Sequence, residues 1–122
     1  MIAHVILFRP RADLSSEARQ ALIGLVEKAL GSIPSIRTWH VGRRVVLGHA
    51  YETREQADYP YVAILEFDDA SALGAYLEHP AHVELAARFY AAVDDALVYD
   101  FEMAEGRAGA FHGTPLGTSG DR

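Results

Sequence analysis

Two strand-like segments that are apolar on both faces constrain the fold of this chain more than any other feature. Residues 2–9 (IAHVILFR) and 59–67 (YPYVAILEF) are rich in β-branched and aromatic side chains, which is typical of strands. Successive side chains of a strand point to opposite faces, so both segments present apolar residues to both sides of a sheet. Helices that cover one face would leave the second face in water. We therefore expect a second copy of the chain to cover it, in an isologous homodimer with face-to-face sheets.

The other elements are arranged around these strands in the order β-α-β-β-α-β. Apolar residues recur at helical spacing between Ala18 and Ala29, and Ser15 is suited to cap the start of that helix. Further along the chain we expect a strand at 36–46, a long connection at 47–58, helical segments at 70–77 and 80–96, and a strand at 97–103. This order is that of a ferredoxin-like α+β fold, with one four-stranded antiparallel sheet and its helices on one face. Together with the expected homodimer, it predicts two such sheets packed face to face.

The length of 122 residues is that of a single domain, which we place at residues 1–103. Residues 104–122 contain five of the ten glycines and little apolar periodicity. We therefore expect this segment to be a flexible C-terminal tail.

Composition and charge exclude several classes of function. The chain has no cysteine, which rules out disulfides, a thiolate nucleophile and cysteine-bound metal, and suits a reducing cytoplasm. Its net charge of −6 has the wrong sign for holding a phosphate backbone, so we expect no nucleic-acid partner. No apolar run approaches the length that spans a bilayer, so we expect neither a membrane partner nor export.

The segment AYLEHPAHV (75–83) places a tyrosine, two histidines and a proline close together. Proline suits the first position of a helix, so we expect His79 to cap a helix that starts at the proline. His82 then lies in the first turn, on the same face as later apolar residues such as Phe89. Burial and the positive end of the helix both disfavour the imidazolium, so His82 should be neutral and able to act as a general base. Tyr76 could donate a hydrogen bond to an oxygen that gains negative charge.

Other interpretations of these residues stay open. His82 could satisfy a backbone acceptor and Tyr76 could fill the core, with no part in chemistry. His79 and His82 have a spacing found in metal sites, but the intervening proline places them on different sides and no third ligand is evident nearby. We therefore expect no metal, and likewise no cofactor. His4 could point into the same cavity as His82 or be an ordinary core histidine.

Several segments resemble the stress-responsive dimeric A/B-barrel (Dabb) family: AHVILFR, IPSIRTWHVGR, YVAILEF, AYLEHPAHV and the final LVYDFE strand. The resemblance covers about residues 2–103 and is most specific at HPAH with Tyr76 upstream. It implies a ferredoxin-like homodimer whose paired sheets form a barrel. One plant member cyclises a linear polyketide thioester without a cofactor, and His82 and Tyr76 match its catalytic histidine and tyrosine. His4 matches a histidine of that enzyme's pocket. By this similarity, His82 would remove the acidic proton between two carbonyls while Tyr76 holds the thioester carbonyl.

The residues and the resemblance together favour a small homodimeric protein with a ligand pocket. The main hypothesis is a cofactor-independent cyclase, lyase or isomerase that acts on polyketide-like carbonyl compounds. Its catalytic residues would be His82 and Tyr76, and the residues that contact a small apolar or carbonyl ligand would be His4, His79 and Phe89. The alternative is a non-catalytic stress-response protein that binds small apolar molecules or stabilises other proteins. A weaker alternative, drawn from other dimeric α+β barrels, is a monooxygenase.

Overall fold

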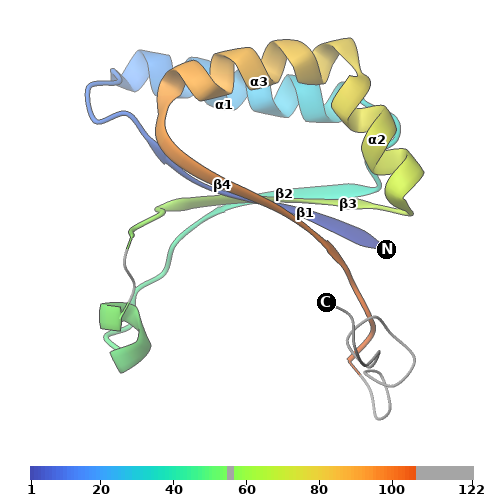
Figure 1. Cartoon of the computed structure of the whole chain (residues 1–122). Coiled ribbons are helices and arrows are strands. Elements are labelled where there is room, and N and C mark those ends of the chain that lie inside the picture. Colours follow the sequence, from blue (N-terminus) through green and yellow to red (C-terminus); the bar gives the residue numbers. More distant parts are fainter. Residues whose placement is uncertain (55–56, 107–122) are drawn as a thin grey trace.

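The computed structural model describes residues 1–54 and 57–106, which form a sheet with helices on one side (Figure 1). The elements are β1 (Ile2–Pro10), α1 (Ser16–Ser32), β2 (Thr38–Arg43), the short 3-10 helix η1 (Ala50–Arg54), β3 (Tyr61–Phe67), α2 (Ala70–Glu78), α3 (Pro80–Ala92) and β4 (Val93–Glu102). The strands form one antiparallel sheet in the order β2-β3-β1-β4, and the three α-helices cover the same face. This arrangement confirms the predicted four-stranded, ferredoxin-like α+β fold.

Two predicted boundaries are wrong, and the pairing of strands explains both. The second strand, expected at 36–46, is limited to β2 because its partner β3 begins opposite Arg43. The helix expected at 80–96 gives way to β4 at Val93, because Val93 already pairs with Pro10 of β1. In both places, ladder hydrogen bonds decide the boundary where the local sequence pattern does not.

Side-chain caps fix where α1 and α2 begin. The Ser15 hydroxyl accepts a hydrogen bond from the N–H of Ala18 at 3.0 Å, and the Asp69 carboxylate accepts one from the N–H of Ala72 at 2.9 Å. The helices then pack their apolar sides on the inner face of the sheet. The buried core consists of Ala29, Leu30, Ile33, Ala63, Leu65, Phe67, Tyr76 and Leu85. These residues come mainly from the C-terminal ends of α1 and β3 and from α2, so the core gathers at one end of the space between helices and sheet.

The connection expected at 47–58 contains η1 and projects from the sheet as an arm (Figure 1). The Glu52 carboxylate accepts hydrogen bonds from the backbone N–H groups of Leu47, Gly48 and His49 at 2.6–2.7 Å. The arm is therefore folded on itself by its own carboxylate, without support from the helices.

The sequence also predicted a flexible C-terminal tail and no segment that spans a membrane. Of the tail expected at 104–122, residues 107–122 lie outside the described residues. Among the described helices, none combines the length and the hydrophobicity that crossing a bilayer requires.

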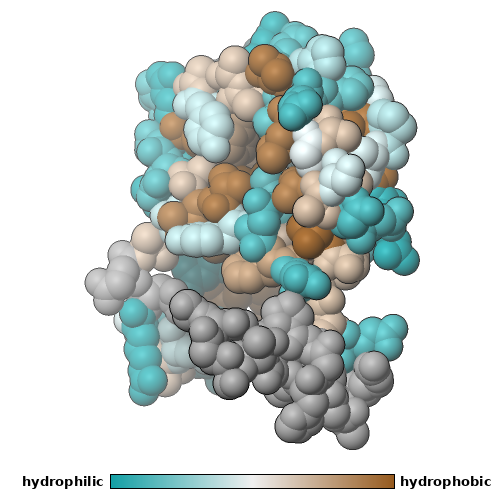
Figure 2. Space-filling view, turned by 45° about the vertical axis from the view of Figure 1, so that its right-hand side comes forward, coloured by the Kyte–Doolittle hydropathy of each residue, from teal (hydrophilic) through white to brown (hydrophobic). Residues whose placement is uncertain are grey.

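The outer face of the sheet, opposite the helices, is apolar and is covered by no described residue. Val5 pairs with Ile64 on one side and with Tyr99 on the other, so the three side chains form a row across the sheet. Tyr99 is 54% exposed and Phe101 is 51% exposed, with their ring centroids 6.2 Å apart. Figure 2 views the layers from the side and shows hydrophobic residues at the surface between polar ones. An apolar sheet face of this kind calls for a partner.

The row formed by Val5, Ile64 and Tyr99 predicts that the chain is a dimer in solution. Light scattering at micromolar concentration should give twice the chain mass of 13.4 kDa. Ile64→Lys should give a monomeric or unfolded chain, because it places a charge in the middle of the apolar face. Val83→Lys is the matched control, since Val83 is 59% exposed on α3, and this variant should stay dimeric. A wild-type chain with the mass of a monomer would contradict this prediction.

Candidate functional site

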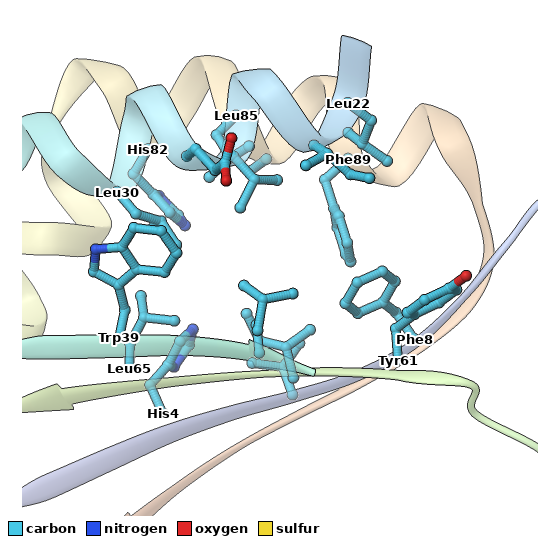
Figure 3. Close-up of a pocket in the computed structure, with 18 of the residues that line it drawn as sticks. His4, Phe8, Leu22, Leu30, Trp39, Tyr61, Leu65, His82, Leu85 and Phe89 are labelled. Atoms are coloured by element: carbon cyan, nitrogen blue, oxygen red, sulfur yellow. The ribbon is translucent and has the colours of Figure 1, made fainter. Parts of the chain in front are cut away.

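A cavity of about 510 Å³ lies between the helices and the inner face of the sheet (Figure 3). Its volume is in the range of sites for small organic molecules. His4, Tyr76 and His82 line it together with Trp39, and Phe8, Tyr61 and Phe89 lie at its other end. The cavity is therefore polar at one end and aromatic at the other.

The break between α2 and α3 shapes the polar end. His79 is the residue between the two helices, and its Nδ1 accepts a hydrogen bond from the N–H of Ala81 at 3.0 Å. Proline follows at the first position of α3, where its missing N–H costs nothing. In an uninterrupted helix, the N–H of Ala81 would bind the carbonyl of Leu77. Because Ala81 instead binds His79, the Leu77 carbonyl is free to accept a hydrogen bond from elsewhere.

His82 uses this carbonyl, and the contact fixes the position of its proton. Nδ1 of His82 lies 3.0 Å from the carbonyl oxygen of Leu77. A carbonyl can only accept, so Nδ1 carries the hydrogen and Nε2 keeps its lone pair. Figure 3 shows the His82 ring pointing from the helix layer into the cavity. Burial lowers the pKa of His82 below 6.5, and the hydrogen bond to Leu77 raises it by a smaller amount. His82 is therefore placed and protonated as a general base requires.

Tyr76 lies between the two histidines of the cavity. Its ring centroid is 4.4 Å from that of His82 and 5.5 Å from that of His4. The side chain is 2% exposed, and its hydroxyl makes no hydrogen bond to any described residue. Burial raises the pKa of Tyr76 to about 12, so the phenol keeps its proton near neutral pH. It can therefore donate a hydrogen bond to a ligand oxygen.

His4 stands on β1 and is paired with a carboxylate of the neighbouring strand. It is 4% exposed, and its Nδ1 lies 2.5 Å from the Asp100 carboxylate on β4. The two residues are opposite each other in the β1–β4 ladder, which places both side chains on the inner face. His4 thus enters the cavity from the sheet, while His82 enters it from the helices (Figure 3).

Aromatic rings close the other end of the cavity. Phe8 stacks on Tyr61 with ring centroids 5.7 Å apart and meets Phe89 edge-on at 5.0 Å. Figure 3 shows open space between this cluster and the two histidines. A ligand that fills the cavity would meet polar groups at one end and apolar rings at the other.

Four of the five predicted site residues lie in this cavity. His4, Tyr76, His82 and Phe89 line it, whereas His79 is not among the lining residues and caps α3. The described residues contain no group of three or more histidine and acidic side chains arranged to hold a metal ion.

Two residues of the polar end were not identified as site residues from the sequence. The contact between Asp100 and His4 is what identifies Asp100. In the sequence, the only signal is a weak one: Asp100 lies two positions after Val98, so the two side chains share the inner face of the strand. Trp39 was expected to fill the core or an interface, and the structure places it in the cavity wall. Only knowledge of the strand register could have assigned either residue.

Comparison with known proteins gives consistent results for sequence and fold. The sequence model of the stress responsive A/B barrel domain matches residues 2–103. The stress-response A/B barrel domain-containing protein HS1 of Arabidopsis thaliana is 27% identical over 101 residues, which are 83% of this chain and 88% of that protein. A hydroxynitrile lyase from Passiflora edulis has a similar structure, with a TM-score of 0.73 at 17% identity over 87% of this chain and 95% of that one. A dimeric ferredoxin-like protein of unknown function from Thermobifida fusca has a TM-score of 0.68 at 20% identity, over 84% and 90% of the two chains.

The tautomer and the pKa of His82 can be tested by NMR. Long-range ¹H–¹⁵N spectra should show the proton on Nδ1 and a titration midpoint below 6.5, with the signal assigned from its loss in His82→Gln. An Nε2–H tautomer or a midpoint above 6.5 would contradict the geometry described here.

The lowered pKa also predicts a pH dependence of stability. The unfolded chain takes up a proton at residue 82 more readily than the native state, so the native state loses stability as pH falls below about 6.5. His82→Gln should remove this part of the loss. Urea unfolding at equal protein concentration, at pH 7.5 and pH 5.5, should therefore show a smaller decrease for the variant than for the wild type.

Proposed function

Because the chain belongs to the stress responsive A/B barrel domain family, we propose that it is a cofactor-independent enzyme that acts on carbonyl compounds. The observation that carries the proposal is the hydrogen bond from His82 to the Leu77 carbonyl, which leaves Nε2 unprotonated in an apolar cavity. A neutral imidazole in that position is suited to remove a proton from carbon.

The chemical step uses two groups of this chain. Nε2 of His82 takes a proton from the carbon next to a carbonyl, and the electron pair of the C–H bond moves into an enolate. The Tyr76 hydroxyl donates a hydrogen bond to the enolate oxygen, which stabilises the charge that develops there. The small apolar cavity makes this hydrogen bond stronger than it would be in water.

Reactions that start from such an enolate include ring closure, cleavage of a carbon–carbon bond and isomerisation. The hydroxynitrile lyase with a similar structure supports testing bond cleavage alongside cyclisation. His4, Tyr76 and His82 line the polar end of the cavity, and the charged residues Arg19, Glu27 and Arg43 also belong to its lining. The Asp100 carboxylate binds His4 but is not among the lining residues. A carbonyl group can accept a hydrogen bond from Tyr76 at this end, and the aromatic end fits an apolar substituent.

We also propose that the enzyme works as a homodimer in which the apolar outer faces of two sheets pack together. The row of Val5, Ile64 and Tyr99 supplies the physical reason, and the dimeric ferredoxin-like protein from Thermobifida fusca supplies a precedent in the same fold. The cavity lies on the opposite face of the sheet, so the expected interface leaves it open to a ligand.

Exchange of carbon-bound hydrogen for deuterium tests the function directly. Aryl ketones and acyl thioesters with one carbonyl are suitable compounds, because their uncatalysed exchange in D₂O is slow. We expect wild-type protein to accelerate this exchange without oxygen, which separates the reaction from a monooxygenase. His82→Gln should slow it by about 10²- to 10⁴-fold, and Tyr76→Phe by about 10²-fold.

The control variant is His49→Gln, because His49 stacks on Tyr51 in the arm and does not line the cavity. Its exchange rate should equal that of the wild type. If these compounds raise the melting temperature of wild type and His82→Gln equally while neither protein catalyses exchange, the chain is a binding protein and the proposal is wrong.

A further inference from the structure

We propose that His4, held by Asp100, is a second catalytic residue, which exchanges a proton with a substrate oxygen while His82 exchanges one with carbon. This inference rests on the proposed function and extends it from the removal of a proton to the making and breaking of a carbon–carbon bond. It also assigns Asp100 the role of a positioning residue.

The contact with Asp100 defines which nitrogen of His4 is available. Nδ1 lies 2.5 Å from the carboxylate oxygen, which accepts its hydrogen. Nε2 is therefore the nitrogen left for a ligand. It has no hydrogen-bond partner among the described residues, and it is not among their fully buried, unpartnered atoms, so it is accessible from the cavity. Its lone pair or proton is therefore available to a molecule that fills the cavity.

The neighbouring rings hold His4 in this orientation. Phe67 and Tyr76 meet the imidazole edge-on, with ring centroids 6.4 Å and 5.5 Å away. In Figure 3 the His4 ring rises from the sheet with a nitrogen directed toward the cavity. The ring is fixed by packing on its sides and by the carboxylate at Nδ1, so Nε2 is pre-positioned toward a ligand.

The two histidines suit different atoms of one substrate. His82 reaches the cavity from α3 and His4 reaches it from β1, with Tyr76 between them. Burial, and to a lesser degree the nearby His4, lowers the pKa of His82, so His82 is suited to start the reaction as the base. In the proposed sequence of steps the shared proton starts on Nε2 of His4, whose Nδ1 faces the Asp100 carboxylate.

The bond-forming direction balances with one shared proton. His82 takes the proton from the α-carbon, the resulting enolate carbon attacks a second carbonyl carbon, and the new alkoxide takes the proton from Nε2 of His4. The products leave His82 protonated and His4 neutral. The proton returns when the Tyr76 hydroxyl gives its hydrogen to His4 and receives one from His82. Bond cleavage is the same sequence in reverse, with His4 removing the hydroxyl proton.

Two reactions separate the roles of the histidines. Deuterium exchange at the α-carbon of an aryl ketone needs only His82, whereas cleavage of a β-hydroxy ketone with an aryl substituent needs both. Asp100→Asn keeps the size of the side chain and removes its charge. We expect it to lower the cleavage rate by about 10²- to 10⁴-fold while exchange stays within about threefold of the wild type. His4→Gln should show the same split, and His82→Gln should lose both reactions.

Asp95→Asn is the matched control on the same strand, because Asp95 binds the Tyr59 hydroxyl and does not line the cavity. It should leave both rates unchanged. The Nδ1–H signal of His4 should move in Asp100→Asn and not in Asp95→Asn, which checks the contact independently of turnover.

The outcomes distinguish this inference from the function on which it rests. A wild type that catalyses neither reaction contradicts the proposed function and the inference together. The inference alone is contradicted if the wild type catalyses both reactions and the variants Asp100→Asn and His4→Gln do not separate them. That is the case if both variants keep the wild-type rates, or if both lose exchange and cleavage to the same extent.

Discussion

The helix break at Pro80 is the constraint on which the site depends. A continuous helix would commit the Leu77 carbonyl to an intrahelical bond and would leave His82 to find another partner. Because the proline starts a new helix, His79 caps it, and the Leu77 carbonyl becomes the acceptor for Nδ1 of His82. The helix break thus provides the acceptor that fixes the tautomer of the ring, and it does so within one short stretch of chain.

The sheet supplies the second side of the polar end of the cavity. Tyr76, His82 and the Leu77 carbonyl all belong to one short stretch of chain, and a stretch of this kind cannot surround a ligand. β1 brings His4 to the opposite side, and β4 brings the Asp100 carboxylate that orients it. The polar end of the cavity is therefore built from two layers, each with its own hydrogen bond to a fixed acceptor. The apolar remainder of the cavity gives those few polar contacts their strength.

The range of each interaction along the chain explains how much could be predicted from the sequence. The cap at His79 and the inward, neutral His82 depend on residues within about one turn, and these predictions agree with the structure. The direction of His4 stayed open, because it depends on which face of β1 meets the helices. Asp100 could not be identified as the partner of His4, since the two residues are 96 positions apart and the contact requires the β1–β4 register. His79 was also expected to contact a ligand, but its ring caps α3 and does not line the cavity.

The direct passage from α3 into β4 limits how the chain length can vary. α3 ends at Ala92 and β4 begins at Val93, so no loop lies between His82 and Asp100 to absorb an added or lost residue. One residue inserted within the strand before Asp100 would turn that carboxylate to the outer face of the sheet. The arm at residues 44–54, in contrast, is folded by its own Glu52 and stands apart from the cavity. Insertions and deletions that preserve the site are therefore confined to segments such as the arm, and the interval of 18 positions between His82 and Asp100 (100 − 82) is fixed.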